Sequence, residues 1–285
     1  MSYKLLKLNS GNTIPSIGLG CYDIPLNQTV KVVYEACKVG YRHFDTAVLY
    51  GNEQEVINGI SQFLSENPSV PRSEFFYTTK IWNSQQGAKQ TQNAIEKMLS
   101  QIDQGNLQYI DLLLLHSPLP GKTKRLESYG VMQEYVEKGK IKNIGVSNYG
   151  QHHIEELLNW NKLKIKPSVN QIEISPWCMR QEIAQWCLKN DIQVEAYAPL
   201  THGYKLEKQE PEFKKIMEKY NKSPAQILIK WSRQKGYIPL PKTKTLSRLQ
   251  ENIDIDDFEL TKDEIEVIDQ PDVHDPTDWE CLDAP

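Results

Sequence analysis

Residues 109–116 read Tyr109-Ile110-Asp111-Leu112-Leu113-Leu114-Leu115-His116, a run that is almost continuous in apolar side chains. A strand with this composition is buried on both faces, as in the parallel sheets of α/β proteins. The apolar run stops at a histidine. It therefore predicts a central strand of a parallel sheet with a polar group at its carboxyl end.

Strand and helix patterns alternate on both sides of this run. The expected strands are 17–21, 42–45, 76–80, 109–116, 141–147, 168–172, 193–196 and 237–240, and the expected helices are 28–39, 52–64, 89–102, 125–138, 152–160, 180–189, 212–220, 224–234 and 246–252. Eight such units predict a closed (β/α)8 barrel, because closure leaves no sheet edge unpaired. An open doubly wound sheet is the alternative, but Gly18-Leu19-Gly20-Cys21-Tyr22-Asp23 lacks the third glycine of its dinucleotide motif.

Both ends of the chain lie outside these units. Residues 3–8 and 12–15, joined by Ser10-Gly11-Asn12, predict a small β-hairpin before the barrel. Residues 254–285 are acidic but retain Trp279, so we expect this tail to fold back on the body, over the barrel mouth. No Pro/Gly/Ser-rich linker divides the chain, and we expect a single domain over residues 1–285.

Composition narrows the class of protein. A net charge of −4 gives no basic surface for nucleic acid, and no run of eighteen apolar residues predicts a membrane span. The start of the chain is too short and polar for a signal peptide. Five scattered cysteines indicate free thiols in a reducing cytoplasm rather than a disulfide framework. A monomer is the default expectation.

Active sites of (β/α)8 barrels form at the carboxyl ends of the strands. Seven successive predicted strands end in polar or aromatic residues, namely Asp45, Lys80, His116, Ser147-Asn148, Gln171, Tyr197 and Lys242. Each has an ordinary structural explanation by itself, such as a helix cap for Asp45 or a core histidine for His116. Seven in succession are hard to explain by packing, so together they indicate a functional site.

The residue types point to carbonyl chemistry. Tyr50 lies in the turn after strand 42–45, and a free phenol has a pKa of about 10. An ammonium about 4 Å away could lower that pKa by up to about three units. We expect Lys80 to make Tyr50 a useful acid, Asp45 to keep Lys80 charged, and His116 to orient a carbonyl oxygen. This set suits protonation of a C=O group while something else supplies hydride.

The remaining strand ends suit a nicotinamide nucleotide as that hydride source. Ser147, Asn148 and Gln171 carry donors and acceptors for a carboxamide, and Tyr197 offers a flat face for stacking on the ring. Residues 241–248, Pro241-Lys242-Thr243-Lys244-Thr245-Leu246-Ser247-Arg248, gather cations and hydroxyls at a helix start, where phosphate binds well. The alternative for that segment is an ordinary solvated helix entry.

The sequence resembles the aldo-keto reductase family over essentially its whole length, and within it the small fungal and bacterial reductases of aldehydes and ketones. The matching motifs are Gly40-Tyr41-Arg42-His43-Phe44-Asp45-Thr46-Ala47 with Tyr50-Gly51-Asn52-Glu53, Thr79-Lys80-Ile81-Trp82, Asp111-Leu112-Leu113-Leu114-Leu115-His116, Ile144-Gly145-Val146-Ser147-Asn148-Tyr149, Asn170-Gln171-Ile172-Glu173, Ala196-Tyr197-Ala198-Pro199-Leu200 and Pro241-Lys242-Thr243. They are long, ordered and spaced as a barrel requires.

The resemblance implies an NADPH-dependent reductase of small carbonyl compounds. It implies a catalytic tetrad of Asp45, Tyr50, Lys80 and His116, with Tyr50 as the acid. The cofactor contacts that it implies are Ser147, Asn148, Gln171, Tyr197 and Leu200 at the nicotinamide end, Lys242, Thr243 and Arg248 at the 2′-phosphate, and Glu251 and Asn252 near the adenine. The substrate pocket would be formed by Tyr22, Trp82 and His116.

Two departures from the family pattern affect the site. Cys21 replaces the usual threonine, and Ser117 follows His116 where many members carry tryptophan. Segments 118–125 and 201–210 are short, so we expect an open pocket. A non-enzymatic barrel that senses redox state by binding NADPH is the competing function. No metal is expected, because His152-His153-Ile154-Glu155-Glu156 fits a solvated helix start better than a ligand set.

Overall fold

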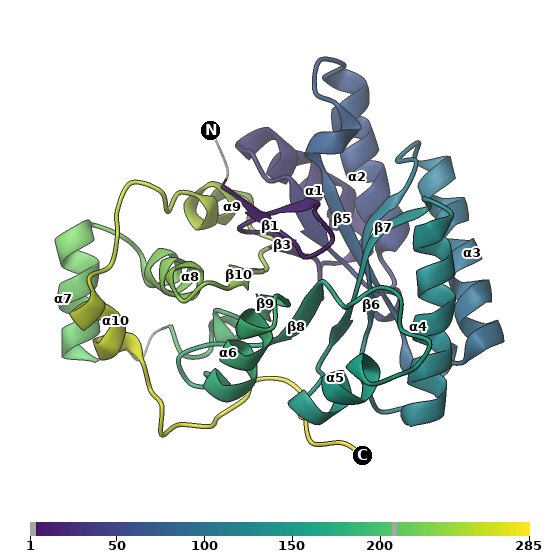
Figure 1. Cartoon of the computed structure of the whole chain (residues 1–285). Coiled ribbons are helices and arrows are strands. Elements are labelled where there is room, and N and C mark those ends of the chain that lie inside the picture. Colours follow the sequence, from purple (N-terminus) through teal and green to yellow (C-terminus); the bar gives the residue numbers. More distant parts are fainter. Residues whose placement is uncertain (1–3, 207–209) are drawn as a thin grey trace.

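The structure is a computed structural model that describes residues 4–206 and 210–285. Its eight parallel strands form one sheet in chain order (Figure 1). They are β3 Leu19–Gly20, β4 His43–Asp45, β5 Phe76–Ile81, β6 Ile110–Leu115, β7 Ile141–Ser147, β8 Val169–Glu173, β9 Gln193–Tyr197 and β10 Ile238–Pro239. The helices are α1 Leu26–Val39, α2 Glu53–Glu66, α3 Ala88–Gln104, α4 Lys122–Glu137, α5 Gln151–Leu158, α6 Gln181–Lys189, α7 Pro211–Tyr220, α8 Pro224–Gln234, α9 Leu246–Ile253 and α10 Lys262–Ile268.

The first and last strands meet and close the sheet. The backbone N–H of Gly20 donates to the carbonyl oxygen of Pro241 at 3.1 Å, and Gly20 pairs with Lys242 in a parallel bridge. A Cβ atom at Gly20 would lie 2.9 Å from the carbonyl oxygen of Leu240, so the strands approach this closely because residue 20 is glycine. The predicted (β/α)8 barrel is confirmed, and the open-sheet alternative is wrong.

The run that predicted the fold forms β6, in which every residue is buried. Leu113 lies opposite Thr79 of β5 and Ile144 of β7. The charged member of the strand, Asp111, accepts a hydrogen bond from the guanidinium of Arg72 at 2.5 Å. That pairing makes a carboxylate tolerable inside an otherwise apolar strand.

The predicted hairpin covers the amino end of the barrel. Its strands, β1 Leu5–Lys7 and β2 Thr13–Pro15, pair antiparallel with Leu6 opposite Ile14. Ile14 packs with Phe76, Leu112 and other apolar residues of the barrel interior. The hairpin prediction is confirmed for these strands, while Tyr3 lies outside the described residues. With the amino end filled, the carboxyl end is left for a ligand.

The acidic tail contains a helix, α10, that was not predicted from the sequence. Thr261 caps it, and the side chain of Glu264 returns to the backbone of Thr261 in a capping box. The helix packs against α7, and beyond it the chain runs past α6 to its end near α5 (Figure 1, yellow). The backbone N–H of Thr277 donates to the carboxylate of Glu173 at 2.6 Å, which ties the tail to the carboxyl end of β8.

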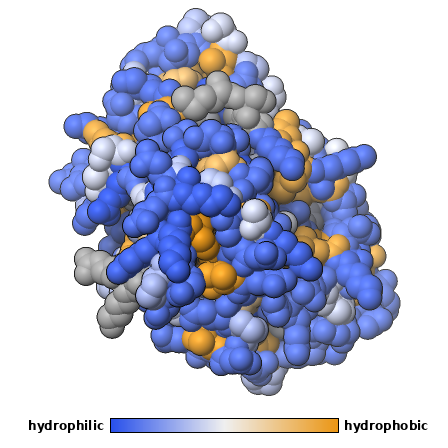
Figure 2. Space-filling model, turned by 90° about the vertical axis from the view of Figure 1, so that its left-hand side faces the viewer, coloured by the Kyte–Doolittle hydropathy of each residue, from blue (hydrophilic) through white to orange (hydrophobic). Residues whose placement is uncertain are grey.

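The outer surface is mostly hydrophilic where Figure 2 shows it. Hydrophobic side chains there form small patches separated by hydrophilic ones. Within the described ranges, no helix combines the length and apolar content needed to cross a membrane.

Candidate active site

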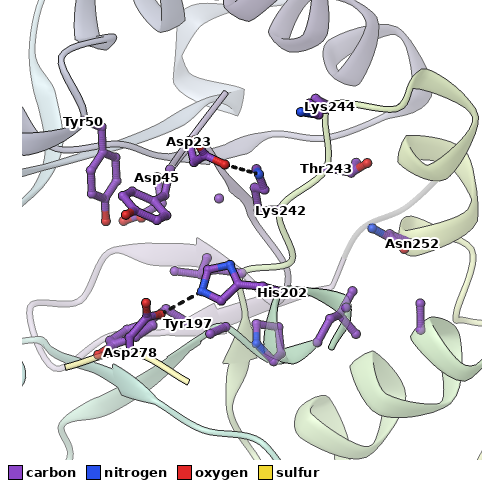
Figure 3. Close-up of a pocket in the computed structure, with 18 of the residues that line it drawn as sticks. Asp23, Asp45, Tyr50, Tyr197, His202, Lys242, Thr243, Lys244, Asn252 and Asp278 are labelled. Atoms are coloured by element: carbon purple, nitrogen blue, oxygen red, sulfur yellow. Dashed lines mark hydrogen bonds and ion pairs between the residues drawn. The ribbon is translucent and has the colours of Figure 1, made fainter. Parts of the chain in front are cut away.

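A cavity of about 990 Å³ opens at the carboxyl ends of the strands (Figure 3). Nearly all the residues to which the sequence pointed line it, namely Tyr22, Asp45, Tyr50, Trp82, His116, Ser147, Asn148, Gln171, Tyr197, Leu200, Lys242, Thr243, Arg248, Glu251 and Asn252. Lys80 is fully buried beneath the cavity floor and contacts Asp45 and Tyr50. One chain thus brings the complete predicted set to one place.

Lys80 stands at the centre of the polar contacts on the floor of this cavity. Its Nζ atom donates to Oδ1 of Asp45 at 2.7 Å, to the carbonyl oxygen of Thr46 at 3.0 Å and to Oη of Tyr50 at 3.2 Å. These three bonds use the full donor capacity of an ammonium group. Tyr50 ends a short 3₁₀ helix, Val48–Tyr50, and the following Gly51 adopts a left-handed φ of 68° that closes the turn.

Lys80 lowers the pKa of Tyr50 as expected, but the net pKa is raised rather than lowered. Burial raises the pKa of Tyr50 to about 12, and the charge of Asp45 acts in the same direction. Lys80 lowers it by charge and by its hydrogen bond, but these effects are outweighed. The phenol therefore holds its proton firmly at neutral pH. Lys80 itself keeps its charge, because Asp45 and Tyr50 outweigh the effect of burial and raise the pKa of the ammonium.

His116 follows β6 directly and faces the same phenol. Its ring centre lies 5.8 Å from that of Tyr50 and 5.0 Å from that of Trp82, both in edge-on geometry. Burial, and then the charge of Lys80, hold the pKa of His116 well below its usual range. The imidazole is therefore neutral and has a single N–H to donate, which suits orientation of a carbonyl oxygen.

The predicted carboxamide-binding residues form one hydrogen-bonded group across three strands. Ser147 Oγ donates to the carbonyl oxygen of Gln171 at 2.8 Å, and Asn148 Nδ2 donates to that of His116 at 3.0 Å. Tyr197 Oη donates to Oδ1 of Asn148 at 2.8 Å. Asn148 adopts a left-handed φ of 60°, which asparagine tolerates better than most residues. These bonds fix the side chains at the cavity wall.

A basic segment lies at the other end of the cavity from Tyr50 (Figure 3). Lys242 pairs with Asp23 at 3.2 Å, whereas no ion pair joins Lys244 or Arg248 to any residue in the described ranges. Thr245 precedes α9 without a side-chain cap, so the first N–H groups of that helix have no hydroxyl partner from it. Unpaired cations beside an uncapped helix start suit a phosphate.

The tail and the segment after β9 contribute cavity residues that were not predicted from the sequence. His202 Nε2 lies 3.1 Å from Oδ2 of Asp278, and both residues line the cavity (Figure 3). The ring centre of Trp279 lies 5.7 Å from that of Trp82 in a tilted arrangement and 6.1 Å from that of His116 in an edge-on arrangement. Nothing in the sequence links His202 to Asp278, which lies 76 positions away. The presence of Trp279 in an otherwise acidic tail was the available sign that the tail reaches the site.

The adjacent histidines that could have been metal ligands contact the C-terminal end of the chain instead. His152 and His153 approach the carbonyl oxygen of Ala284 at 3.0 and 2.6 Å. No group of three or more metal-binding side chains occurs in the part of the chain that the structure describes.

Known proteins share the sequence pattern and the fold of this chain. The sequence model of the Aldo/keto reductase family matches residues 16–272. The chain belongs to the aldo/keto reductase family. It is 56% identical to an uncharacterized oxidoreductase of Saccharomyces cerevisiae over 99% of both chains, and 39% identical to the glyoxal reductase of Bacillus subtilis over 93% of this chain and 91% of that one. A crystal structure of a Bombyx mori aldo-keto reductase in complex with NADP superposes with a TM-score of 0.85 at 32% identity, covering 94% of this chain and 92% of that one.

The two departures from the aldo/keto reductase pattern have different consequences. Cys21 is fully buried and does not line the cavity, and its thiol lies 3.7 Å from the carbonyl oxygen of Leu19. Ser117 donates to Oδ1 of Asn83 at 2.6 Å and does not line the cavity either. Trp279 from the tail stands beside His116 and supplies an aromatic wall.

Proposed function

We propose that this aldo/keto reductase reduces aldehydes and ketones to alcohols with NADPH, using Tyr50 as the general acid. The observation that carries the proposal is the 3.2 Å contact between Nζ of Lys80 and the phenol oxygen of Tyr50, on the floor of the cavity. When bound, a reduced nicotinamide supplies hydride to the carbonyl carbon. The residues of the chain then have to bind, orient and protonate the substrate.

Each member of the tetrad has a role that follows from its contacts. Tyr50 holds a proton at Oη and delivers it to the carbonyl oxygen. Lys80 places a positive charge beside the phenolate that forms. Asp45 keeps Lys80 charged and in place, at 2.7 Å. His116, neutral at pH 7, donates its N–H to the same carbonyl oxygen. A pKa of about 12 keeps Tyr50 fully protonated before the reaction, as an acid must be.

The residues present fit a nicotinamide nucleotide. Both N–H groups of the Gln171 amide are used inside the protein, at 2.8 and 2.7 Å, so its oxygen remains available to accept from a carboxamide. Tyr197 lines the cavity and would stack on the ring, with Ser147, Asn148 and Leu200 beside it.

The far end of the cavity favours NADPH over NADH. Lys242, Thr243 and Arg248 would hold the 2′-phosphate, since Arg248 has no acidic partner within the described ranges. Glu251 and Asn252 line the same end and would contact the adenosine. Every residue of this site comes from one chain, so catalysis needs no second copy, and we propose a monomer. Five free thiols support a reducing, cytoplasmic location.

Substrate reduction is tested by NADPH consumption with excess carbonyl compound over many turnovers. The panel should include glyoxal, methylglyoxal, an aromatic aldehyde and a ketone, since a relative is named for glyoxal reduction. Multiple turnover with NADPH, and much slower turnover with NADH, is the expected result. NADPH binding without turnover on any carbonyl would favour a redox sensor. Absence of NADPH binding would contradict the whole proposal.

A further inference from the structure

Glu195, in the middle of β9, is a fully buried carboxyl group that the tetrad does not use. Side chains alternate across a barrel strand, which places Glu195 on the same interior face as Tyr197. Its Oε2 atom accepts a hydrogen bond from Nε2 of Gln171 at 2.7 Å. A carboxyl group in this position needs an explanation, because burial without a cationic partner is costly.

The amide of Gln171 is shared between two carboxyl groups. Nε2 donates to Oδ2 of Asp45 at 2.8 Å and to Oε2 of Glu195 at 2.7 Å. Both acceptors must face the nitrogen, so the orientation of the amide is fixed. Gln171 lines the cavity, and its Oε1 atom forms no hydrogen bond with a described residue. The oxygen is therefore left for an N–H donor from a ligand.

Charge balance indicates which form of Glu195 does this. The buried cation, Lys80, is already paired with Asp45 at 2.7 Å. His43 Nε2 lies 3.4 Å from Oε1 of Glu195, but burial lowers the pKa of His43 to about 3, so this imidazole is neutral. Burial, and then the charge of Asp45, raise the pKa of Glu195 well above its ordinary value. Burial without a cationic partner therefore favours the carboxylic acid form.

We propose that Glu195 is a positioning residue for the cofactor: it takes one amide hydrogen of Gln171, Asp45 takes the other, and the amide oxygen is thereby held toward the nicotinamide carboxamide. The inference rests on the proposed function, since it assigns that ligand to the cavity. Glu195 acts through Gln171 and touches neither cofactor nor substrate. It does so in its neutral form, which adds no second negative charge beside Asp45.

Two variants separate positioning from mere packing. Glu195→Leu removes the acceptor, and Glu195→Gln keeps an oxygen acceptor without a titratable proton. Calorimetric titrations would compare NADPH with 2′-phospho-ADP-ribose, which lacks the nicotinamide. In Glu195→Leu we expect NADPH affinity to fall about five- to tenfold, the value of one hydrogen bond, with unchanged affinity for the fragment. Glu195→Gln should restore NADPH affinity to near the wild-type value.

The outcomes are distinguishable. Wild-type protein that binds neither ligand would contradict the proposed function. Wild-type binding of both, with equal losses or no loss in Glu195→Leu, would overturn the positioning role. Failure of Glu195→Gln to restore NADPH affinity would show that the ionised carboxylate matters, which also overturns the proposal.

A second measurement needs no ligand and does not use the leucine variant, so it remains possible if that variant fails to fold. Folding raises the pKa of Glu195, so this carboxyl group stabilises the fold less as pH rises from its ordinary pKa through the raised one. The melting temperature of Glu195→Gln relative to wild type should therefore increase from about pH 5 to pH 8. Glu182→Gln, the same change at an exposed position on α6, should show no such trend. A flat difference for Glu195→Gln would contradict the neutral carboxylic acid.

Discussion

The side-chain nitrogen of Lys80 lies 3.2 Å from the phenol oxygen of Tyr50. Lys80 is fully buried, so water screens this contact little. The same nitrogen lies 2.7 Å from Oδ1 of Asp45, which keeps the lysine charged. The arrangement leaves Tyr50 protonated at rest and offers a countercharge to the phenolate that proton transfer creates.

Replacing Lys80 by methionine should remove that countercharge with little change in side-chain size. We expect kcat to fall by about 10²- to 10⁴-fold, because the phenolate would form without a neighbouring cation. The free energy of unfolding should fall by about 3–5 kcal/mol, since Asp45 is left buried and unpaired. Adding Asp45→Asn should recover part of the stability but none of the turnover. Steady-state kinetics and thermal unfolding check both effects, and wild-type kcat in the single variant would contradict the role.

Arg248→Ala should change the choice of cofactor rather than the chemistry. We expect KM for NADPH to rise about tenfold, the value of a charge-assisted hydrogen bond, while KM for NADH and kcat stay nearly constant. Lys262→Ala, an exposed cation on α10, is the matched control. Steady-state measurements with both nucleotides provide the test. Equal losses for NADPH and NADH would show that Arg248 does not read the 2′-phosphate.

The His202–Asp278 pair should stabilise the tail in a pH-dependent way. The hydrogen bond that His202 donates to the Asp278 carboxylate raises the pKa of His202. The pair therefore stabilises the fold while His202 is charged, and this effect is lost as pH rises through the raised pKa. Lys242 opposes the shift and Glu173 supports it. Asp278→Asn should destabilise the fold more at pH 6 than at pH 9, and the difference in the free energy of unfolding should be under about 1 kcal/mol because the pair is partly exposed.

The control for that experiment is His202→Asn. It replaces the other partner of the pair and should also remove the pH dependence. Thermal unfolding of the three proteins between pH 6 and 9 is sufficient. A destabilisation by Asp278→Asn of equal size at both ends of the range would mean that the contact is not an ion pair.

Much of the fold and site could be predicted from local patterns. An apolar run that stops at a polar residue, as at Asp45 or His116, predicts both a strand and a cavity at the end of that strand. The barrel followed because eight such units repeat in order. Helix α10 was missed within an acidic stretch, although Thr261 and Glu264 have the spacing of a capping box.

Other features depend on distances that no local pattern contains. The pKa of Tyr50 reflects a balance between burial, Lys80 and Asp45, and the sequence showed only the residue types. Alternation places Glu195 on the same face of its strand as Tyr197, but no local pattern shows that its carboxyl group contacts Gln171, 24 positions away. The contact between His202 and Asp278 spans 76 positions and requires the path of the tail.

The most direct test of the mechanism is Tyr50→Phe, which removes the phenol oxygen and keeps the ring. Two quantities should be measured on the same preparation: the Kd for NADPH, by quenching of tryptophan fluorescence, and the rate of NADPH oxidation by the best carbonyl of the panel. We predict a nearly unchanged Kd, with kcat reduced by at least about 10²-fold. Wild-type turnover in this variant would contradict Tyr50 as the general acid and, with it, the account of the site.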